Sequence, residues 1–198
     1  MNAATIILAA GFSSRMGSDK ALLDLGGKLV LERIVSSYQS AGVRRIVVMT
    51  GQNHEQLRQL NLKVELVRNP VPEEGMFSSV KSGVVALGGC CEPFFIHPVD
   101  TPLVSQQTLQ LLFQALEQQI ENDAVIPCCA GKRGHPPLVH QRLSGAILAY
   151  TGTDGLRGLL ANCPVVEIPV TDQGVLLGMN TPQQYEALQR YLVTLQTY

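Results

Sequence analysis

The sequence predicts an α/β fold of three layers, in which helices cover both faces of a mainly parallel sheet. Short apolar runs with strand character alternate with longer segments whose apolar residues recur at helical spacing. Several of the short runs are apolar at successive positions, which is typical of strands buried on both faces. Such alternation indicates a parallel sheet with crossover helices. No repeat, linker or low-complexity stretch divides the chain, so residues 1–198 are expected to form one domain.

The expected strands are short and mostly apolar. They are Thr5–Ala9, Arg45–Met49, Val64–Val67, Pro93–His97, Ala124–Pro127 and Val165–Pro169, and residues 175–177 form a further strand-like run. Ligands of open parallel sheets bind beyond the carboxyl ends of the strands. The loops that follow Ala9, His97, Pro127 and residues 175–177 are therefore the places where a functional site is expected.

Segments between the strands have the spacing of helices with one buried face. The first presents Leu31, Ile34, Val35 and Tyr38 and stops at Gly42. The second, after Pro102, presents Leu109, Leu112, Phe113, Leu116 and Ile120. The last begins with a capping box made by Thr181 and Gln184, with Pro182 at the first helical position. Its expected buried face consists of Tyr185, Leu188, Leu192 and Leu195.

The composition is that of a globular cytoplasmic protein. With 45% apolar and 16% charged residues, the chain can fill a sizeable core, which excludes disorder. A net charge of −1 gives no general attraction for nucleic acid or an anionic membrane, so neither is expected as a partner. No apolar run approaches the ~18 residues of a membrane span, and the N-terminus lacks the basic region of a signal peptide. An odd number of cysteines, 5, then favours reduced thiols in the cytoplasm.

The loop after the first expected strand is rich in small residues and carries Arg15 and Lys20. Small residues let the backbone approach an anion, so that its N–H groups can cradle phosphate oxygens. The two cations would add fixed positive charge. Neither G-x-G-x-x-G nor G-x-x-x-x-G-K-[ST] is present. The residues alone therefore leave two interpretations, a phosphate-binding loop or a surface turn with solvated cations.

Asp100 lies just beyond the expected strand Pro93–His97 and two residues before Pro102. A carboxylate at this place suits Mg²⁺, which takes one or two carboxylates together with substrate phosphate oxygens. Asp-x-Pro sequences also shape turns, which is the alternative role for Asp100. His97 is expected to position this loop or to pack beneath it. A base is not needed there if the nucleophile is an ionised phosphate.

The first loop closely resembles the signature of the nucleotidyltransferases that act on the molybdenum cofactor. The shared pattern is Leu8-Ala9-Ala10-Gly11-x-Ser13-x-Arg15-Met16-Gly17-x-x-Lys20. The molybdenum cofactor cytidylyltransferase group, within the molybdopterin nucleotidyltransferases, is the nearest match. The resemblance implies a Rossmann-like nucleotidyltransferase fold. It also implies that the loop wraps the triphosphate of the incoming nucleotide, with binding residues Leu8, Ala10, Gly11, Ser13, Arg15, Gly17 and Lys20.

The resemblance extends from Ile6 to about Tyr185 and implies roles for other segments. It makes Asp100 a Mg²⁺ ligand and, together with Arg15 and Lys20, a catalytic group. Ser78 and Ser79 resemble part of a Gly-Met-Ser-Ser stretch that lies against the nucleoside, although N-capping of a helix by serine is the alternative.

The implied acceptor side of the site is formed by two later segments. His135 lies in a segment that resembles the family's Arg-Gly-His-Pro, which faces the cofactor substrate. An exposed basic hairpin is the alternative interpretation of residues 131–137. Residues 154–160 also match a family stretch and are assigned to the substrate side.

One departure from the family pattern concerns the metal. Before the last helix the family usually has Asp-x-Asp-Thr-Pro, whereas this chain has Gly178-Met179-Asn180-Thr181-Pro182. An asparagine oxygen can still coordinate Mg²⁺ but brings no negative charge. Asp100 and Asn180 are therefore the expected metal ligands, and weak metal binding is expected without nucleotide.

The implied reaction transfers CMP from CTP to the terminal phosphate of the phosphorylated pterin cofactor and releases pyrophosphate. The implied partners are CTP or another NTP, the pterin cofactor and a molybdoenzyme that receives the product, and Mg²⁺ is the implied cofactor. Three alternatives stay open: guanylyl transfer, nucleotidyl transfer to a sugar or polyol phosphate, and a non-catalytic cofactor-binding chaperone. Ala10 favours cytosine, because the related guanylyltransferases generally have Leu-Ala-Gly-Gly. Gly178 and Asn180 favour the chaperone.

Overall fold

The strands form one mixed sheet in the computed structural model, which describes residues 1–11, 18–89 and 92–196. Its order is β3-β2-β1-β4-β7-β5-β6, and β8 also pairs with β5. The strands are β1 Ala4–Ala9, β2 Arg45–Thr50, β3 Glu65–Arg68, β4 Phe94–Pro98, β5 Ala124–Cys129, β6 Lys132–Arg133, β7 Leu138–Val139 and β8 Val165–Pro169. Strands β1 to β4 pair in parallel, as do β5 and β8, and the short β6 and β7 run antiparallel to their neighbours. The prediction of a mainly parallel sheet is confirmed.

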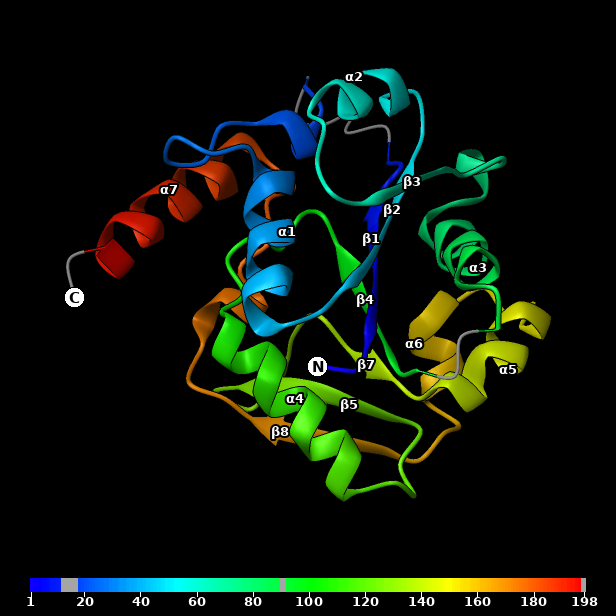
Figure 1. The fold of residues 1–198 in the computed structure, drawn as a ribbon. Coiled ribbons are helices and arrows are strands. Elements are labelled where there is room, and N and C mark those ends of the chain that lie inside the picture. The colour runs from blue at the N-terminus through cyan, green and yellow to red at the C-terminus, as the bar shows by residue number, and fades with distance from the viewer. Residues whose placement is uncertain (12–17, 90–91, 197–198) are drawn as a thin grey trace.

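Helices cover both faces of the sheet, as Figure 1 shows. On one face lie α1 Val30–Ala41, α4 Gln106–Gln118 and α7 Pro182–Gln196, and on the other lie α3 Met76–Leu87, α5 Ser144–Ala149 and α6 Gly155–Leu160. A short helix, α2 His54–Gln59, follows β2. Among the described residues, no helix has both the length and the apolar character to cross a membrane. The predicted three-layer arrangement is therefore present.

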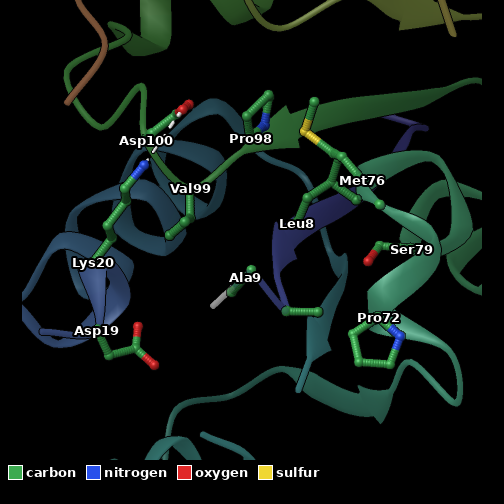
Figure 2. A pocket seen from close by; sticks show the side chains of 13 residues that line it. Leu8, Ala9, Asp19, Lys20, Pro72, Met76, Ser79, Pro98, Val99 and Asp100 are labelled. Atoms are coloured by element: carbon green, nitrogen blue, oxygen red, sulfur yellow. Dashed lines mark ion pairs between the residues drawn. The ribbon is translucent and has the colours of Figure 1, made fainter. Parts of the chain in front are cut away.

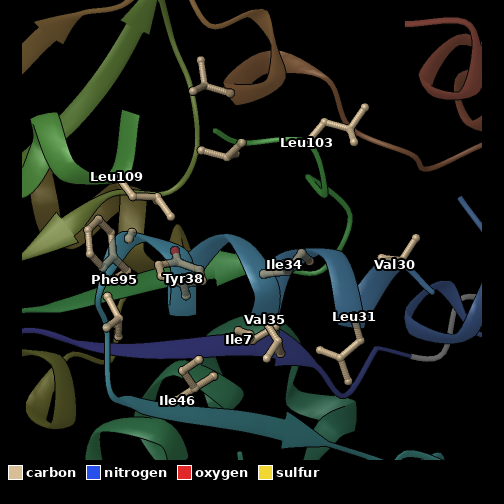
Figure 3. Packing of buried hydrophobic residues seen from close by; sticks show 14 of the residues in the cluster. Ile7, Val30, Leu31, Ile34, Val35, Tyr38, Ile46, Phe95, Leu103 and Leu109 are labelled. Carbon is tan, nitrogen blue, oxygen red and sulfur yellow. The ribbon is translucent and has the colours of Figure 1, made fainter. Parts of the chain in front are cut away.

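Burial on both faces explains why the strands are apolar at successive positions. In β1, Ile7 and Ala9 pack into the core beneath α1 and α4, whereas Ile6 and Leu8 pack into the core beneath α3. Figure 3 shows the first of these cores, with the predicted face of α1 lying against the sheet. That face consists of Leu31, Ile34, Val35 and Tyr38, which are all buried, and the helix ends before Gly42 as predicted.

Two residues that were expected on buried helix faces are exposed. Helix α4 ends at Gln118 and the chain turns there toward β5, so Ile120 lies outside the helix and is 66% exposed. Leu195 is 51% exposed because the end of α7 extends beyond the core, which α7 reaches through Leu188 and Leu192. The predicted capping box is confirmed: the Gln184 amide donates to Thr181 Oγ1 (3.3 Å), and the Thr181 amide donates to Gln184 Oε1 (3.1 Å).

The strand-like run at residues 175–177 is not a strand. Residues Gln173–Leu176 form a 3-10 turn that Asp172 caps by accepting from the Gly174 amide at 2.8 Å. Val175 is buried in the core beneath this turn, so its apolar character reflects packing and not strand pairing. A hairpin, which was the alternative interpretation of residues 131–137, does begin in this segment: β5 and β6 pair across the turn at Ala130 and Gly131.

Candidate functional site

A cavity of about 250 Å³ opens at the carboxyl ends of β1 and β4 (Figure 2). Within the sheet, β2 and β3 lie on one side of β1, whereas β4 lies on its other side. Loops that leave such a switch point diverge and leave a crevice, where ligands of open α/β sheets bind. The cavity is lined by Leu8, Ala9, Ala10, Gly11, Asp19, Lys20, Pro72, Gly75, Met76, Ser79, Pro98, Val99 and Asp100. It lies where the sequence placed the site, after the first and fourth strands.

Three of the predicted polar residues meet at one wall of this cavity. The Lys20 ammonium lies 2.7 Å from Asn180 Oδ1 and 3.9 Å from Asp100 Oδ2. Figure 2 shows the side chains of Lys20 and Asp100 directed toward each other on the same side of the cavity. The Met179 amide donates to the Asp100 carbonyl (2.9 Å) and thereby ties the chain before α7 to the loop after β4. The structure thus brings together groups that are separated by 80 and 160 positions in the chain.

Lys20 is held in place by a local cap. It is the first residue of a 3-10 turn, Lys20–Leu22, whose N-cap Asp19 accepts from the Ala21 amide at 2.8 Å. Asp19 also lines the cavity. Sequence reasoning missed Asp19, although an aspartate directly before a helical segment is a typical cap signal.

Beneath the Asp100 loop, His97 joins β4 to α1. Its ring is 2% exposed, with Nε2 at 2.9 Å from the Thr101 carbonyl and Nδ1 at 2.8 Å from the Tyr38 hydroxyl. A carbonyl only accepts, so Nε2 carries the proton and Tyr38 donates to Nδ1. Burial lowers the pKa of His97 to about 4, against a partly opposing effect of the bond to Thr101. The neutral ring is therefore a buried support of the loop, in agreement with the prediction.

The backbone of the first loop is braced from β2. Asn53 is buried, and its Nδ2 donates to the Ala9 carbonyl (2.9 Å) while its Oδ1 accepts from the Gly51 amide (3.0 Å). A Cβ on Gly51 would lie 2.7 Å from the Ala10 oxygen, so only glycine fits there. Leu8, Ala10 and Gly11, which were predicted to bind the nucleotide, line the cavity. Their binding role stays a prediction, and the supporting residues Gly51 and Asn53 were missed. Their signal is the Gly-x-Asn that follows an expected strand.

Some of the predicted loop residues fall outside the described part of the chain. These are Ser13, Arg15 and Gly17, which lie between residues 11 and 18. Their predicted role in binding the triphosphate stays a prediction.

Ser78 and Ser79 differ in their position relative to the cavity. Ser79 lines it, whereas Ser78 is the third residue of α3 and donates to the carbonyls of Gly75 (2.8 Å) and Val71 (3.0 Å). Neither serine is the N-cap. That position belongs to Gly75, whose φ of 89° is one that glycine adopts without strain. The alternative interpretation, in which a serine caps this helix, is wrong.

His135 lies at the Asp100 side of the site but does not line the cavity. Its amide donates to the Val175 carbonyl at 2.8 Å. His135 is an exposed residue. Partial desolvation by the surrounding protein still lowers its pKa below the ordinary value, while the charge of Asp100 opposes that shift. In the same segment, Arg133 pairs with Glu167 at 2.7 Å.

The donor set at Asp100 fits a metal ion that arrives with phosphate groups. Asp100 offers a carboxylate and Asn180 an amide oxygen, and both are hard oxygen donors that Mg²⁺ accepts. In the described ranges, no group of three or more His, Cys, Asp or Glu side chains could hold a metal by itself. Mg²⁺ commonly uses few protein ligands together with substrate phosphates, so one carboxylate and one amide oxygen are sufficient.

Comparison with known proteins gives a consistent family. Residues 5–188 match the model of the MobA-like NTP transferase domain. The chain is 30% identical to a probable molybdenum cofactor guanylyltransferase of Bacillus mycoides (strain KBAB4), over 96% of each chain. It is 25% identical to the molybdenum cofactor cytidylyltransferase of Escherichia coli (strain K12), over 94% of this chain and 95% of that protein.

Solved structures show the same fold. A nucleotidyl transferase from Methanothermobacter superposes with a TM-score of 0.81 at 22% identity, covering 97% of this chain and 98% of that one. At this identity the likeness speaks for the fold alone. The expected Rossmann-like nucleotidyltransferase fold is thus confirmed.

Proposed function

The chain belongs to the MobA-like NTP transferase domain family, and we propose that this nucleotidyltransferase moves CMP from CTP to the terminal phosphate of the molybdenum cofactor. The observation that carries the proposal is the meeting of Lys20 with Asp100 in a cavity at the switch point of the sheet. Relatives named molybdenum cofactor guanylyltransferase and cytidylyltransferase support the acceptor.

In the proposed reaction, an oxygen of the acceptor's terminal phosphate attacks the α-phosphorus of CTP. A new P–O bond forms as the bond between the α-phosphorus and the bridging oxygen breaks, and pyrophosphate leaves with that oxygen and its electron pair. Such transfer depends on positioning and on stabilisation of spread negative charge. The attacking phosphate is already ionised, so no side chain has to remove a proton.

The residues around the cavity have distinct roles in this proposal. The backbone from Ala10 to Gly11 approaches the phosphates, since both residues line the cavity. Lys20 stabilises charge on the leaving pyrophosphate, with Arg15 as its partner. Asp100 and Asn180 would hold Mg²⁺. When bound, that ion supplies positive charge to the phosphate oxygens.

The size of the Ala10 side chain favours CTP over GTP as the substrate. Its side chain is buried at the cavity wall, where a methyl group reduces the room for a base. Guanylyl transfer is the second candidate, because relatives with that name reach 30% identity. Size exclusion by one methyl group is worth only ~1–3 kcal/mol, so the preference is expected to be graded.

We propose that His135 contributes to the part of the site that binds the acceptor, because the charge of Asp100 acts on its ring and partly opposes the lowering of its pKa. A molybdoenzyme would receive the product. A cytoplasmic location is proposed with it, and the free thiols of Cys128, Cys129 and Cys163 agree with a reducing compartment.

The test is release of pyrophosphate from each of the four common NTPs in the presence of purified pterin cofactor and Mg²⁺. CTP should give the fastest release, and Asp100→Asn should abolish most of it while leaving the melting temperature nearly unchanged. Faster release with GTP would make the protein a guanylyltransferase. Release only with a sugar or polyol phosphate would change the acceptor, and cofactor binding without release would indicate a chaperone.

A further inference from the structure

Asn69 is a buried polar residue that contacts Ser79, one of the residues that line the cavity. It follows β3 and is 5% exposed. Its backbone N–H donates to the Thr50 carbonyl at the end of β2 (2.8 Å). Its side chain makes three hydrogen bonds. Nδ2 lies 2.7 Å from Ser78 Oγ and 2.9 Å from Ser79 Oγ, while Oδ1 accepts from the Val71 amide at 3.1 Å. It therefore connects the sheet to the first turn of α3.

The orientation of the Asn69 amide group follows from its partners. A backbone N–H can only donate, so the side-chain atom that faces Val71 must be the oxygen. The nitrogen then faces the two serines, and both of its hydrogens are directed at hydroxyl oxygens. Ser78 and Ser79 are consequently acceptors toward Asn69, and the proton of each hydroxyl must be donated elsewhere.

The two hydroxyl protons have different destinations. The single hydroxyl proton of Ser78 is shared between the carbonyls of Gly75 and Val71, so it is satisfied inside the protein. Ser79 is 4% exposed and lines the cavity. Its hydroxyl oxygen accepts a hydrogen bond from Asn69 Nδ2. Within the described ranges, no group accepts the hydroxyl proton of Ser79. Figure 2 shows Ser79 on the side of α3 that faces the cavity. Its proton is therefore available to a ligand.

We propose that Asn69 is a positioning residue that fixes Ser79 as a hydrogen-bond donor toward an acceptor atom of the bound nucleotide, on its base or ribose. The inference rests on the proposed function, because it takes the cavity to be the NTP site. It separates the two serines that the sequence treated alike: Ser79 contacts the nucleotide, and Ser78 supports the helix start. A buried donor without a partner is costly to leave unmet, so a nucleotide that presents an acceptor there is favoured.

The test reverses the polarity of Asn69 without changing its shape. In Asn69→Asp, studied at a pH where the carboxylate is ionised, the side chain can still accept from Val71. Its other oxygen also accepts, so it draws the Ser79 proton away from the cavity. Ser79→Ala removes the same proton directly. Each variant should raise KM and Kd for the NTP about three- to tenfold, as expected for one neutral hydrogen bond. The kcat and the KM for the pterin acceptor should change little.

Coupling between the two residues distinguishes positioning from general stability. The double variant Asn69→Asp/Ser79→Ala should bind NTP no more weakly than the weaker single variant, because both act through one proton. Ser78→Ala is the matched control, and it should lower the melting temperature but leave the KM for NTP unchanged. Leu116→Ala, in the core beneath α4, controls for instability alone. If Asn69→Asp does not fold, Asn69→Ala removes both donors without adding charge.

The outcomes separate this inference from the proposed function. A folded Asn69→Asp with wild-type affinity for NTP would overturn the inference, as would additive effects of the two substitutions or an unchanged KM in Ser79→Ala. Wild-type protein that binds NTP but releases no pyrophosphate would refute the proposed function. The inference would then still be decided by NTP titration of the same variants.

Discussion

Lys20 lies between one charged and one neutral oxygen, which sets the charge of the cavity wall. Its ammonium is 3.9 Å from the Asp100 carboxylate and 2.7 Å from the Asn180 amide oxygen. The three side chains together are therefore neutral. A second carboxylate in place of Asn180 would give this wall a negative charge, against which a triphosphate must approach. Asparagine thus orients Lys20 without adding repulsion, at the expense of metal affinity.

Removing the Lys20 ammonium should weaken nucleotide use more than stability. One charge-assisted contact is worth about 1.5–3 kcal/mol, or roughly ten- to a hundredfold in affinity or rate. Steady-state kinetics of Lys20→Ala should show this loss. Lys28→Ala, an exposed lysine nearby in sequence, is the matched control and should behave as wild type. A large fall in melting temperature with normal NTP affinity would make Lys20 a structural residue.

The size of residue 10 should tune the choice of base. Ala10→Gly removes a buried methyl group from the cavity wall, so the larger purine should fit better. The preference for CTP over GTP should fall by ~1–3 kcal/mol without a full reversal. Ratios of kcat/KM for the two nucleotides measure it. If the wild-type protein already uses both equally well, Ala10 does not select the base.

At the scale of elements, the Asp100 loop is anchored to α1 through β4. The His97 ring is hydrogen-bonded to the Tyr38 hydroxyl on α1 and to the Thr101 carbonyl in the loop. The Tyr38 ring also packs against the Phe95 ring of β4, with 5.3 Å between the ring centroids. Because this network is buried, the loop cannot shift without breaking hydrogen bonds in a region of low dielectric. The carboxylate of Asp100 is therefore presented by a rigid support.

Because His97 is buried in its neutral form, the free energy of unfolding should fall in mild acid. The pKa of His97 is about 4 in the native state, below its ordinary value of 6.5, so the unfolded chain binds the proton more readily. The stabilisation is complete above pH ~6.5 and is lost as the pH falls toward ~4, by about 3 kcal/mol if no other change intervenes. Urea unfolding at several pH values measures the slope. His97→Gln keeps a donor and an acceptor but does not titrate, and it should lack this part of the slope. Parallel pH curves for both proteins would contradict the assignment.

At the scale of the whole molecule, the site exists because segments far apart in sequence meet at one edge of the sheet. The register pairs Leu8 with Pro98, so the loops after β1 and β4 leave the sheet side by side. The start of α7 then closes the wall through Asn180, and the start of α3 closes the opposite wall through Ser79. A ligand in the cavity would contact four segments and stabilise the entire fold.

Binding should therefore be visible in the melting temperature. Mg²⁺ alone should shift Tm little, because only one of its two expected ligands, Asp100, carries a negative charge. CTP with Mg²⁺ at about a hundred times its Kd stabilises by about 2.7 kcal/mol, which corresponds to a rise of roughly 5–10 °C for a chain of this size. Asn180→Asp should respond more strongly to Mg²⁺ alone and need less Mg²⁺ for turnover. An identical Mg²⁺ dependence in both proteins would place Asn180 outside the metal shell.

The layers, most helix faces and the edge of the sheet where the cavity opens could be predicted from the sequence. These follow from local periodicity and from the rule that ligands bind at the carboxyl ends of parallel strands. It also named Lys20, Asp100 and Asn180 as candidate site residues, through the family resemblance; they lie together in the structure, and their roles stay predictions. Failures of the local pattern occur where helices leave the core, at Ile120 and Leu195, because burial there depends on neighbouring elements.

The hydrogen-bond partners of the buried polar groups, by contrast, became known only from the folded chain. Asn69, Asn53 and His97 contact groups that are far from them in sequence, and no local spacing encodes the direction of those hydrogen bonds. The same holds for Ser78 and Ser79, which are adjacent in the chain but separated in role by one helical step of about 100°. Sequence periodicity reports burial, whereas hydrogen-bond partners depend on how distant segments meet.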